Sequence, residues 1–337
     1  MKLAPVVDIG GRRRAPCRPA PGMGMRATTA VVLCVTIAGG GSCRDERTEV
    51  PLPTHARRVV VLAPNLAEIV ADIGAGDRLV GISSYGAAPE GAGGAARVGG
   101  FTDPSVERII ELRPDLVIGV PFQRQALESC RDASLATLEV DCQTVQQVLD
   151  AYITIGRALE RLDDSTRVRD HLARRLDEVR RSVAGRSRPR TLFLLGRAGE
   201  DLQQVFPVAP GNFGHEILDL AGGRNVIDRA VPSISTETVI ALAPEVIIEA
   251  SMDDHRDARE QVLPPSPLWS RLPSVPAVRD GRVTALASSS LLVPGPRMAD
   301  GAELMARLLH GAGPPLGDSP EAPAAGVSSG TGAASTP

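Results

Sequence analysis

A fourteen-residue segment that occurs twice constrains the fold of this chain more than any other feature. The segment SVERIIELRPDLVI at 105–118 returns as STETVIALAPEVII at 235–248, with Ser, Glu, Ile, Leu, Pro, an acidic residue and the closing Ile in the same places. Proline cannot continue a helix, and the apolar run after it has the length of a buried strand. Each copy therefore predicts a helix followed by a strand, and the pair predicts two related halves.

Further strands and helices are expected around the first copy, and together they predict a sheet in the first half. Apolar runs of strand length alternate there with helical patterns, one of which covers 123–132. The expected strands lie at 57–64, 78–82, 115–120 and 136–140. Strands that are buried on both faces and alternate with helices are typical of a parallel sheet.

The second half repeats this scheme. Strands are expected at 190–196 and 225–227, a further helix and strand within the second copy, and a strand at 282–286 that closes the sheet. A last helix is expected to begin at Pro296. The loose similarity between AEIVADIGAGDRLVGI in the first half and HEILDLAGGRNVI in the second supports two homologous lobes.

Apolar stripes at helical spacing occupy the region between the halves, and its second helix, at about 165–184, would be about 30 Å long. No glycine-rich hinge interrupts it, so we expect lobes that open and close only slightly. The predicted fold class is α/β, with two Rossmann-like lobes of mainly parallel sheet joined by a long rigid α-helix and a ligand cleft between the lobes. The expected organisation is an N-terminal extension and signal peptide at 1–42, a linker at 43–56, an N-terminal lobe at 57–143, a helical connector at 144–186, a C-terminal lobe at 187–310 and a disordered tail at 311–337.

The segment MRATTAVVLCVTIAGGGSC at 25–43 carries a positive charge, a short apolar run and small residues before Cys43. The apolar run is too short to cross a hydrocarbon core of about 30 Å as a helix, so we interpret it as a signal peptide that starts at Met23 or Met25. Its Gly-Gly-Ser-Cys ending resembles a bacterial lipoprotein signal, which implies lipidation of Cys43. Simple secretion and a retained anchor remain alternatives.

Several classes of function fit the sequence poorly. The formal net charge is −3 with both signs scattered, so we expect no nucleic-acid partner. GAGDRLVG at 74–81 follows a helix and lacks the spacing of dinucleotide or phosphate-binding loops, and no nucleophile motif is present, so we expect no enzyme. Cys130 and Cys142 are expected at opposite ends of the sheet, too far apart for a disulfide. A bare-metal receptor is also disfavoured, and we expect no metal site, because the histidines do not cluster; they are His55, His171, His215, His255 and His310.

In open parallel sheets a ligand binds beyond the carboxyl ends of the strands. That rule selects the loops that follow the expected strands, and aromatic side chains are informative there because they make up only 2% of the chain. The candidate ligand-binding residues are Pro64, Asn65, Tyr85, Phe101, Phe122, Phe206 and Arg297. The alternatives are core packing for Tyr85 and Phe206, a helix-capping pair for Asn65 with Glu68, and a solvent-facing first-turn position for Arg297.

The repeated glutamates need a separate explanation. Asp103 and Ser233 stand at equivalent positions and can cap their helices, which places Glu107 and Glu237 in the first turns. A first-turn carboxylate is favoured by the helix dipole, so a local explanation exists for each. Two lobes with one carboxylate each at matched places could instead offer a two-point acidic surface to a partner.

Together these segments resemble the bacterial periplasmic binding proteins for cobalamin and ferric chelates, and the resemblance covers about 57–309. It implies that Glu107 and Glu237 dock the loaded protein on arginines of an ABC-transporter permease dimer. It also implies a ligand that is cobalamin-like, a ferric siderophore or heme, with no intrinsic cofactor. The segment VPSISTE lacks the tryptophan that cobalamin binders can have there, which weakens cobalamin, and no arginine cluster points to a carboxylate-rich siderophore.

We expect a monomer in the periplasm or on the outer face of the cytoplasmic membrane, where the lipoprotein-like signal implies an anchor by a lipid on Cys43. Two alternatives remain open for the function. One is a surface lipoprotein of the same fold that acts as a sensor, and the other is a receptor for a bare metal ion.

Overall fold

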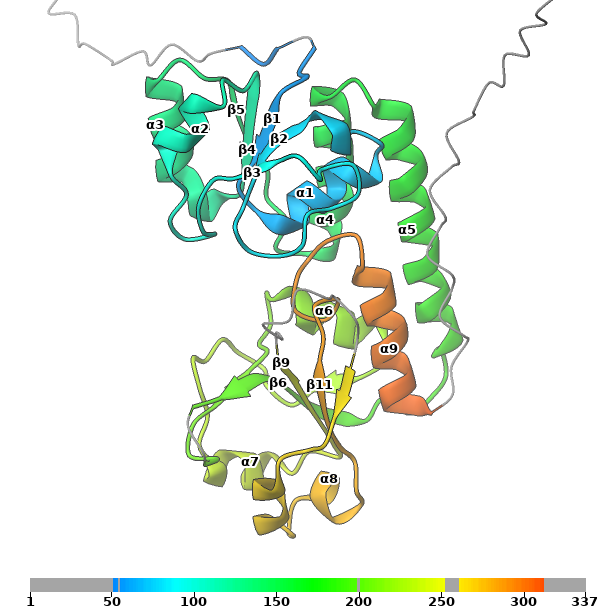
Figure 1. Cartoon of the computed structure of the whole chain (residues 1–337). Coiled ribbons are helices and arrows are strands. Elements are labelled where there is room, and N and C mark those ends of the chain that lie inside the picture. The colour runs from blue at the N-terminus through cyan, green and yellow to red at the C-terminus, as the bar shows by residue number, and fades with distance from the viewer. Residues whose placement is uncertain (1–50, 54, 199–200, 252–260, 312–337) are drawn as a thin grey trace, which may run out of the picture. The chain divides into compact units, whose positions relative to one another are not determined.

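The chain forms two β-sheets, with helices α4 (Val145–Ala158) and α5 (Leu162–Ser182) between them in sequence (Figure 1). The predictions for the signal peptide, for Cys43 and for the tail beyond Gly311 lie outside the residues that the structure describes. The computed structural model describes residues 51–53, 55–198, 201–251 and 261–311.

The first sheet is parallel throughout and runs in the order β3-β2-β1-β4-β5. All four strands expected in this half are confirmed in shortened form, and the two-residue edge strand β3 was not predicted. The strands are β1 (Val59–Val61), β2 (Leu79–Ile82), β3 (Ala96–Arg97), β4 (Leu116–Gly119) and β5 (Thr137–Glu139).

Helices cover both faces of this sheet. Val59 and Val61 of β1 belong to one buried cluster and Val60 to another, as expected for alternating side chains of a central strand. The first cluster includes residues of α1 and α4, and the second includes residues of α2 and α3. The helices of this half are α1 (Pro64–Asp72), α2 (Val106–Glu111) and α3 (Arg124–Asp132), with short 3₁₀ turns η1 (Gly76–Arg78) and η2 (Pro121–Gln123).

The second sheet is mixed and runs in the order β10-β11-β9-β6-β7, with β8 also paired to β6. The prediction that the strand at 282–286 closes the sheet is wrong, because β10 pairs antiparallel with β11 on its outer side. β7 is antiparallel as well, and neither short strand carries a strong apolar pattern. The strands are β6 (Arg190–Arg197), β7 (Val205–Pro207), β8 (Arg224–Asn225), β9 (Val246–Ser251), β10 (Gln261–Leu263) and β11 (Val283–Ala287).

The second sheet also has a buried cluster on each face. Phe193 of β6 joins the cluster that contains α6 and α9, whereas Leu192 and Leu194 join a cluster with Trp269. The last helix begins at Met298, two residues after Pro296, and Arg297 is its N-cap, whose carbonyl accepts from the N–H of Gly301 at 3.1 Å. The helices are α6 (Phe213–Leu220), α7 (Thr236–Leu242), α8 (Pro276–Arg279) and α9 (Met298–His310), with the 3₁₀ turn η3 (Pro267–Arg271).

The connector consists of α4 and the 21-residue α5, which packs against α4 and against α9. Thr144 starts α4 with a capping box in which its hydroxyl accepts from the backbone N–H of Gln147. Arg175 of α5 binds Asp300 at 2.6 Å and Glu303 at 2.8 Å, which fixes α5 to α9. No helix within the described ranges combines the length and apolarity needed to cross a bilayer.

Candidate functional site

Three aromatic side chains gather at the carboxyl ends of strands in the first sheet, and we call them the aromatic ledge: Tyr85, Phe101 and Phe122. The rings of Phe101 and Phe122 stack with centroids 5.4 Å apart and an interplanar angle of 10°. The Tyr85 ring lies next to the backbone just before Phe101, because a Cβ atom placed on Gly100 would come within 3.2 Å of it. The structure therefore brings together three of the residues that the sequence analysis selected from different loops.

The ledge is unusual in its exposure. The side chains of Tyr85 and Phe122 are 60% and 67% exposed, whereas Tyr152, Phe193 and Trp269 are at most 2% exposed. Core packing, the alternative considered for Tyr85, is therefore wrong for that residue. An aromatic side chain this exposed gains little folding free energy from burial, so its presence favours contact with another molecule.

A buried glutamine holds the ledge in place. The Gln123 amide donates 2.9 Å hydrogen bonds to the carbonyls of Leu62 and Phe101, and its oxygen accepts from the N–H of Val120. Gln123 is only 3% exposed, and these bonds join the ends of β1 and β4 to the loop of Phe101. Sequence analysis missed this residue, because a glutamine inside a helical pattern carries no signal of such a role.

An arginine fixes the loop that carries Tyr85. Arg97 donates from Nη1 to the carbonyl oxygens of Ser83 at 2.6 Å and Gly86 at 3.1 Å. The N–H of Ser84 also donates to the carbonyl of Gly99 at 2.7 Å. The loop after β2 is therefore held by hydrogen bonds on both sides of Tyr85.

Pro64, Asn65 and Arg297 occupy a different arrangement from the one expected. Pro64 is the first residue of α1, whose N-cap Ala63 makes no side-chain hydrogen bond, so the proposed Asn65–Glu68 capping pair is wrong. Asn65 instead donates to the carbonyl of Pro294 at 2.8 Å. Sequence analysis could not detect this role, because the partner lies 229 residues away and only tertiary folding brings it to Asn65.

Arg297 joins the same contact region. It donates to Glu68 at 2.9 Å and to the hydroxyl of Ser289 at 2.6 Å. Burial raises the pKa of Glu68 above its usual range, and the nearby Arg297 partly offsets that shift. These bonds connect α1 with the segment before α9, so Arg297 makes intramolecular contacts rather than facing solvent as a bare first-turn residue. Its role as a ligand contact stays a prediction.

The second sheet offers a charged pair beside an aromatic residue. Arg197 at the end of β6 pairs with Glu249 of β9, and the indole N–H of Trp269 donates to Glu249 at 3.2 Å. Phe206 of β7 is half-buried, and its ligand contact stays a prediction.

The two repeated glutamates lie in first turns as expected, but their caps differ from the prediction. Ser105 and Ser235 are the N-caps, each accepting from a backbone N–H at 3.4 Å, so the capping roles given to Asp103 and Ser233 are wrong. The residues ahead of each cap form extended bridges, Gly99 with Pro104 and Val205 with Ile234, which keeps the earlier side chains out of the helix start. Both glutamates are exposed.

Hydrogen bonding favours the charged form of both carboxylates. The pKa of Glu107 is lowered chiefly by its own backbone N–H and next by the Ser105 hydroxyl, which donates at 3.1 Å. The pKa of Glu237 is lowered chiefly by the Ser235 hydroxyl and next by its own backbone N–H. Each half therefore presents an ionised carboxylate at neutral pH.

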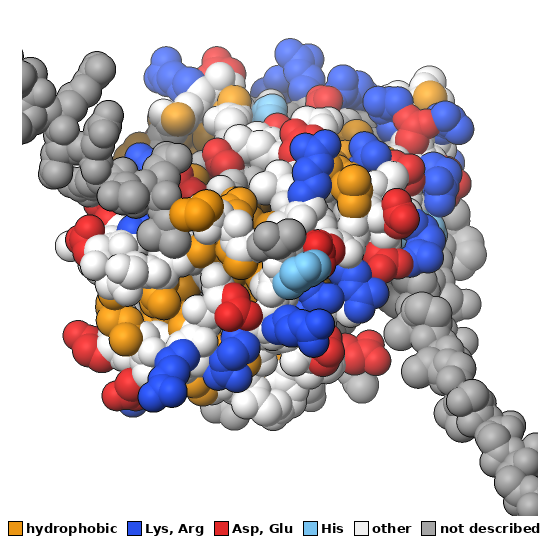
Figure 2. Space-filling view, turned by 90° about the horizontal axis from the view of Figure 1, so that it is seen from above, with side chains coloured by type: hydrophobic (Ala, Val, Ile, Leu, Met, Phe, Trp, Pro, Cys, Tyr) orange, Lys and Arg blue, Asp and Glu red, His pale blue; other side chains and the backbone are white. Residues whose placement is uncertain are grey.

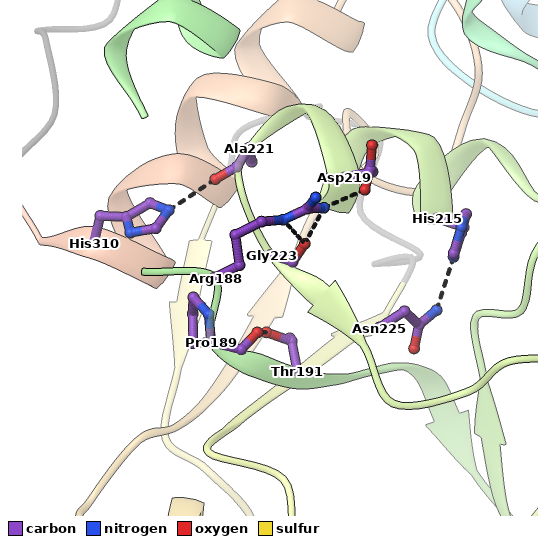
Figure 3. Close-up of polar contacts among 9 residues, drawn as sticks. All are labelled: Arg188, Pro189, Thr191, His215, Asp219, Ala221, Gly223, Asn225 and His310. Carbon is purple, nitrogen blue, oxygen red and sulfur yellow. Dashed lines mark hydrogen bonds and ion pairs between the residues drawn. The ribbon is translucent and has the colours of Figure 1, made fainter. Parts of the chain in front are cut away.

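Two of the described histidines make separate contacts in the second half of the chain. Figure 3 shows His310 of α9 with Nε2 3.0 Å from the carbonyl of Ala221, and His215 of α6 with Nδ1 3.1 Å from the Asn225 amide. In the same view Arg188 donates to the carbonyl of Gly223 at 2.7 Å. No cluster of three or more potential metal ligands occurs among the described residues, and His255 lies outside them.

Charge is interspersed on the face that Figure 2 shows, in line with the scattering of both signs along the chain. On the face shown in Figure 2, basic and acidic side chains alternate around apolar ones, and no single sign dominates that face. Cys130 and Cys142 are buried thiols without a disulfide between them.

The chain is similar in sequence to periplasmic binding proteins. A family model described as periplasmic binding protein matches residues 59–289. The vitamin B12-binding protein of Vibrio cholerae serotype O1 is 26% identical over 257 residues, which cover 74% of this chain and 88% of that protein.

Solved structures share the fold. The periplasmic vitamin B12 binding protein BtuF of Vibrio cholerae matches with a TM-score of 0.64 at 25% identity, over 76% of this chain and 98% of that one. The periplasmic heme-binding protein BhuT, solved in complex with two hemes, matches with a TM-score of 0.62 at 24% identity, over 75% of this chain and 97% of that one.

Proposed function

Because the chain belongs to the periplasmic binding protein family, we propose that it captures a cobalamin-like or ferric-chelate ligand between two lobes and delivers it to an ABC-transporter permease. The relatives named for vitamin B12 and for heme support this class of ligand. Neither relative is similar enough to transfer its own ligand. The choice of ligand therefore depends on the chemistry of this chain.

The aromatic ledge is the observation that carries the proposal. Its exposed rings at Tyr85 and Phe122 offer flat apolar faces at the edge of a sheet where ligands of such folds bind. A corrin, a porphyrin or the aromatic arms of a siderophore present extended surfaces that can pack against such faces. Metal coordination by the protein is not required, because these ligands bring their metal already chelated.

The ligand test uses thermal unfolding followed by direct titration. The purified chain is screened against cobalamin, heme and ferric siderophores, and a ligand at about 100 times its dissociation constant should stabilise the fold by about 2.7 kcal/mol. That corresponds to an increase in Tm of about 5–10 °C for a protein of this size. Absence of stabilisation by all of these compounds would contradict the proposed ligand class.

Substitutions then locate the binding surface. Phe122→Ala should weaken binding of the identified ligand by about tenfold or more, because the substitution removes the exposed ring that the ligand would cover. Val262→Ala is the matched control, since Val262 is 70% exposed on β10 and lies in the second sheet. Equal affinities for the wild type and Phe122→Ala would place the ligand elsewhere.

Delivery is proposed to depend on Glu107 and Glu237, which register the two lobes on cationic groups of the permease. The double variant Glu107→Ala with Glu237→Ala should abolish ligand uptake and keep ligand affinity within about threefold, because rim charges chiefly set register and association rate. Glu111→Ala is the matched control: it removes an exposed acid from α2 whose counterpart in α7 is Ala241. A large loss of ligand affinity in the double variant would assign the glutamates to the ligand site.

The location of the protein follows from the same proposal. A binding protein that serves an importer works outside the cytoplasmic membrane, and a lipid on Cys43 would keep it there. Labelling with a radioactive fatty acid, with Cys43→Ser as control, tests that anchor. Ligand binding without any effect of the glutamates on uptake would favour the sensor alternative.

A further inference from the structure

Two exposed isoleucines occupy matched places on the repeated helices α2 and α7, which are labelled in Figure 1. Ile110 and Ile240 are each 42% exposed, and each lies three residues after the repeated glutamate. The neighbouring positions Ile109 and Val239 are fully buried, so each helix is anchored by one apolar residue and presents the next one to solvent. An isoleucine so exposed adds little to folding and is a weaker helix former than alanine or leucine.

The anchoring beneath these helices is also duplicated. The Arg58 guanidinium donates to the carbonyl of Leu112 at 2.6 Å, and the Arg190 guanidinium donates to the carbonyl of Leu242 at 2.6 Å. The residue between each helix and the following proline has a positive φ in both halves, 46° at Arg113 and 42° at Ala243.

An acid completes each anchor. The N–H of Arg58 donates to Asp115 at 2.8 Å, and the N–H of Arg190 donates to Glu245 at 2.8 Å. The same bonds therefore hold both helices on their sheets, so the exposed residues project from matched scaffolds.

The other exposed positions of the two helices have diverged. Arg108 corresponds to Thr238 and Glu111 corresponds to Ala241. What the exposed faces retain is one carboxylate and one isoleucine each. Since the scaffold would accept other residues at these positions, the retained pair is better explained by a shared partner chemistry than by the fold.

We propose that Ile110 and Ile240 are apolar anchors of the permease-docking surface, each entering an apolar recess next to the cationic group that meets the neighbouring glutamate. This inference rests on the proposed function, because it requires a permease that presents the same recess twice. The negative charges of Glu107 and Glu237 call for a cationic group in each recess of the permease. The isoleucines call for an apolar surface beside that group. The carboxylates set register and the isoleucines supply burial.

The test measures binding of the full chain to the permease–ATPase complexes of the same organism, reconstituted in lipid nanodiscs. Ile110→Ala and Ile240→Ala should each weaken binding by about fivefold, and the double variant by about 25-fold if the two sites are independent. Val262→Ala is the control for an exposed apolar side chain outside the repeat and should leave affinity unchanged. The thermal unfolding of the isoleucine variants should be close to that of the wild type, because both residues are 42% exposed and alanine is the better helix former.

Salt separates the apolar part from the charged part. Added salt should reduce the loss of affinity caused by Glu107→Ala and Glu237→Ala, and leave the loss caused by the isoleucine variants unchanged. Unchanged binding of both isoleucine variants, with binding lost in the glutamate variants, would overturn the apolar anchors and leave the proposed function standing. A loss at only one of the two isoleucines would overturn the duplicated anchor. If the wild type binds none of the complexes, both the inference and the proposed function are overturned.

Discussion

Replacing Gly156 with alanine should destabilise the helical connector. Gly156 lies in α4 where α5 crosses it, and a Cβ atom there would lie 2.0 Å from the Oγ and 2.5 Å from the Cβ of Ser165. Ser165 is fully buried, so its side chain cannot turn toward solvent to make room. Helices α4 and α5 must therefore move apart to admit one methyl group.

The magnitude follows from two opposing effects. Alanine is favoured over glycine inside a helix by about 1 kcal/mol. Overpacking of a tight core costs about 1–3 kcal/mol, and contacts this short belong at the upper end of that range. The net loss of unfolding free energy should be about 2 kcal/mol, or a decrease in Tm of about 4–8 °C.

The assay is urea unfolding followed by far-ultraviolet circular dichroism, with a rescue variant. Ser165→Gly removes both clashing atoms, although it also removes the 2.9 Å hydrogen bond from the Ser165 hydroxyl to the carbonyl of Leu162. Ser165→Gly should therefore lower the unfolding free energy less in the Gly156→Ala background than in the wild type, or even raise it. Gly93→Ala is the neutral control, because no atom lies within 4 Å of a Cβ placed there. An unchanged or higher stability of Gly156→Ala would refute the close approach of α4 and α5.

Two further predictions concern buried titratable groups. Burial raises the pKa of Asp72 above its ordinary value of 3.8, partly offset by the hydroxyl of Tyr152 donating at 2.6 Å, so its contribution to stability is present below about pH 4 and is lost as the pH rises through the raised pKa. Asp72→Asn should therefore flatten the fall in unfolding free energy above pH 4 in urea titrations, and an unchanged pH profile would contradict this. Burial also raises the pKa of Cys130 to about 11 and that of Cys142 to about 12, so iodoacetamide at pH 8 should label both thiols only in denaturant. Peptide mapping that finds either residue labelled in the native protein would show that its burial is transient.

The repeat predicted the fold well because its signals are local. A proline that ends a helix and an apolar run after it determine α2 with β4 and α7 with β9 from neighbouring residues alone. The edge strands β7 and β10 escaped prediction, since each is three residues long and is defined by its pairing with a distant strand. Local pattern has little to say about such pairings.

The candidate site was predicted only in part, because some of its residues have local signals in the sequence and others do not. Tyr85 and Phe122 were selected because strand ends and rare aromatic residues are visible in the sequence, and their contact with a ligand stays a prediction. The role of Asn65 was misread as capping, because its real partner at Pro294 is distant in the chain. Gln123 was not found at all, since its importance depends on three backbone groups that only the folded chain brings to it.

The lone tryptophan gives the molecule an optical label in one half. Trp269 is packed in the apolar cluster of the second sheet and bonded to Glu249, whereas both tyrosines precede that sheet in the chain. Selective excitation of the indole therefore follows the second half, and tyrosine emission follows the remainder. A single unmodified sample can in this way reveal whether the two halves unfold as one cooperative unit or in sequence.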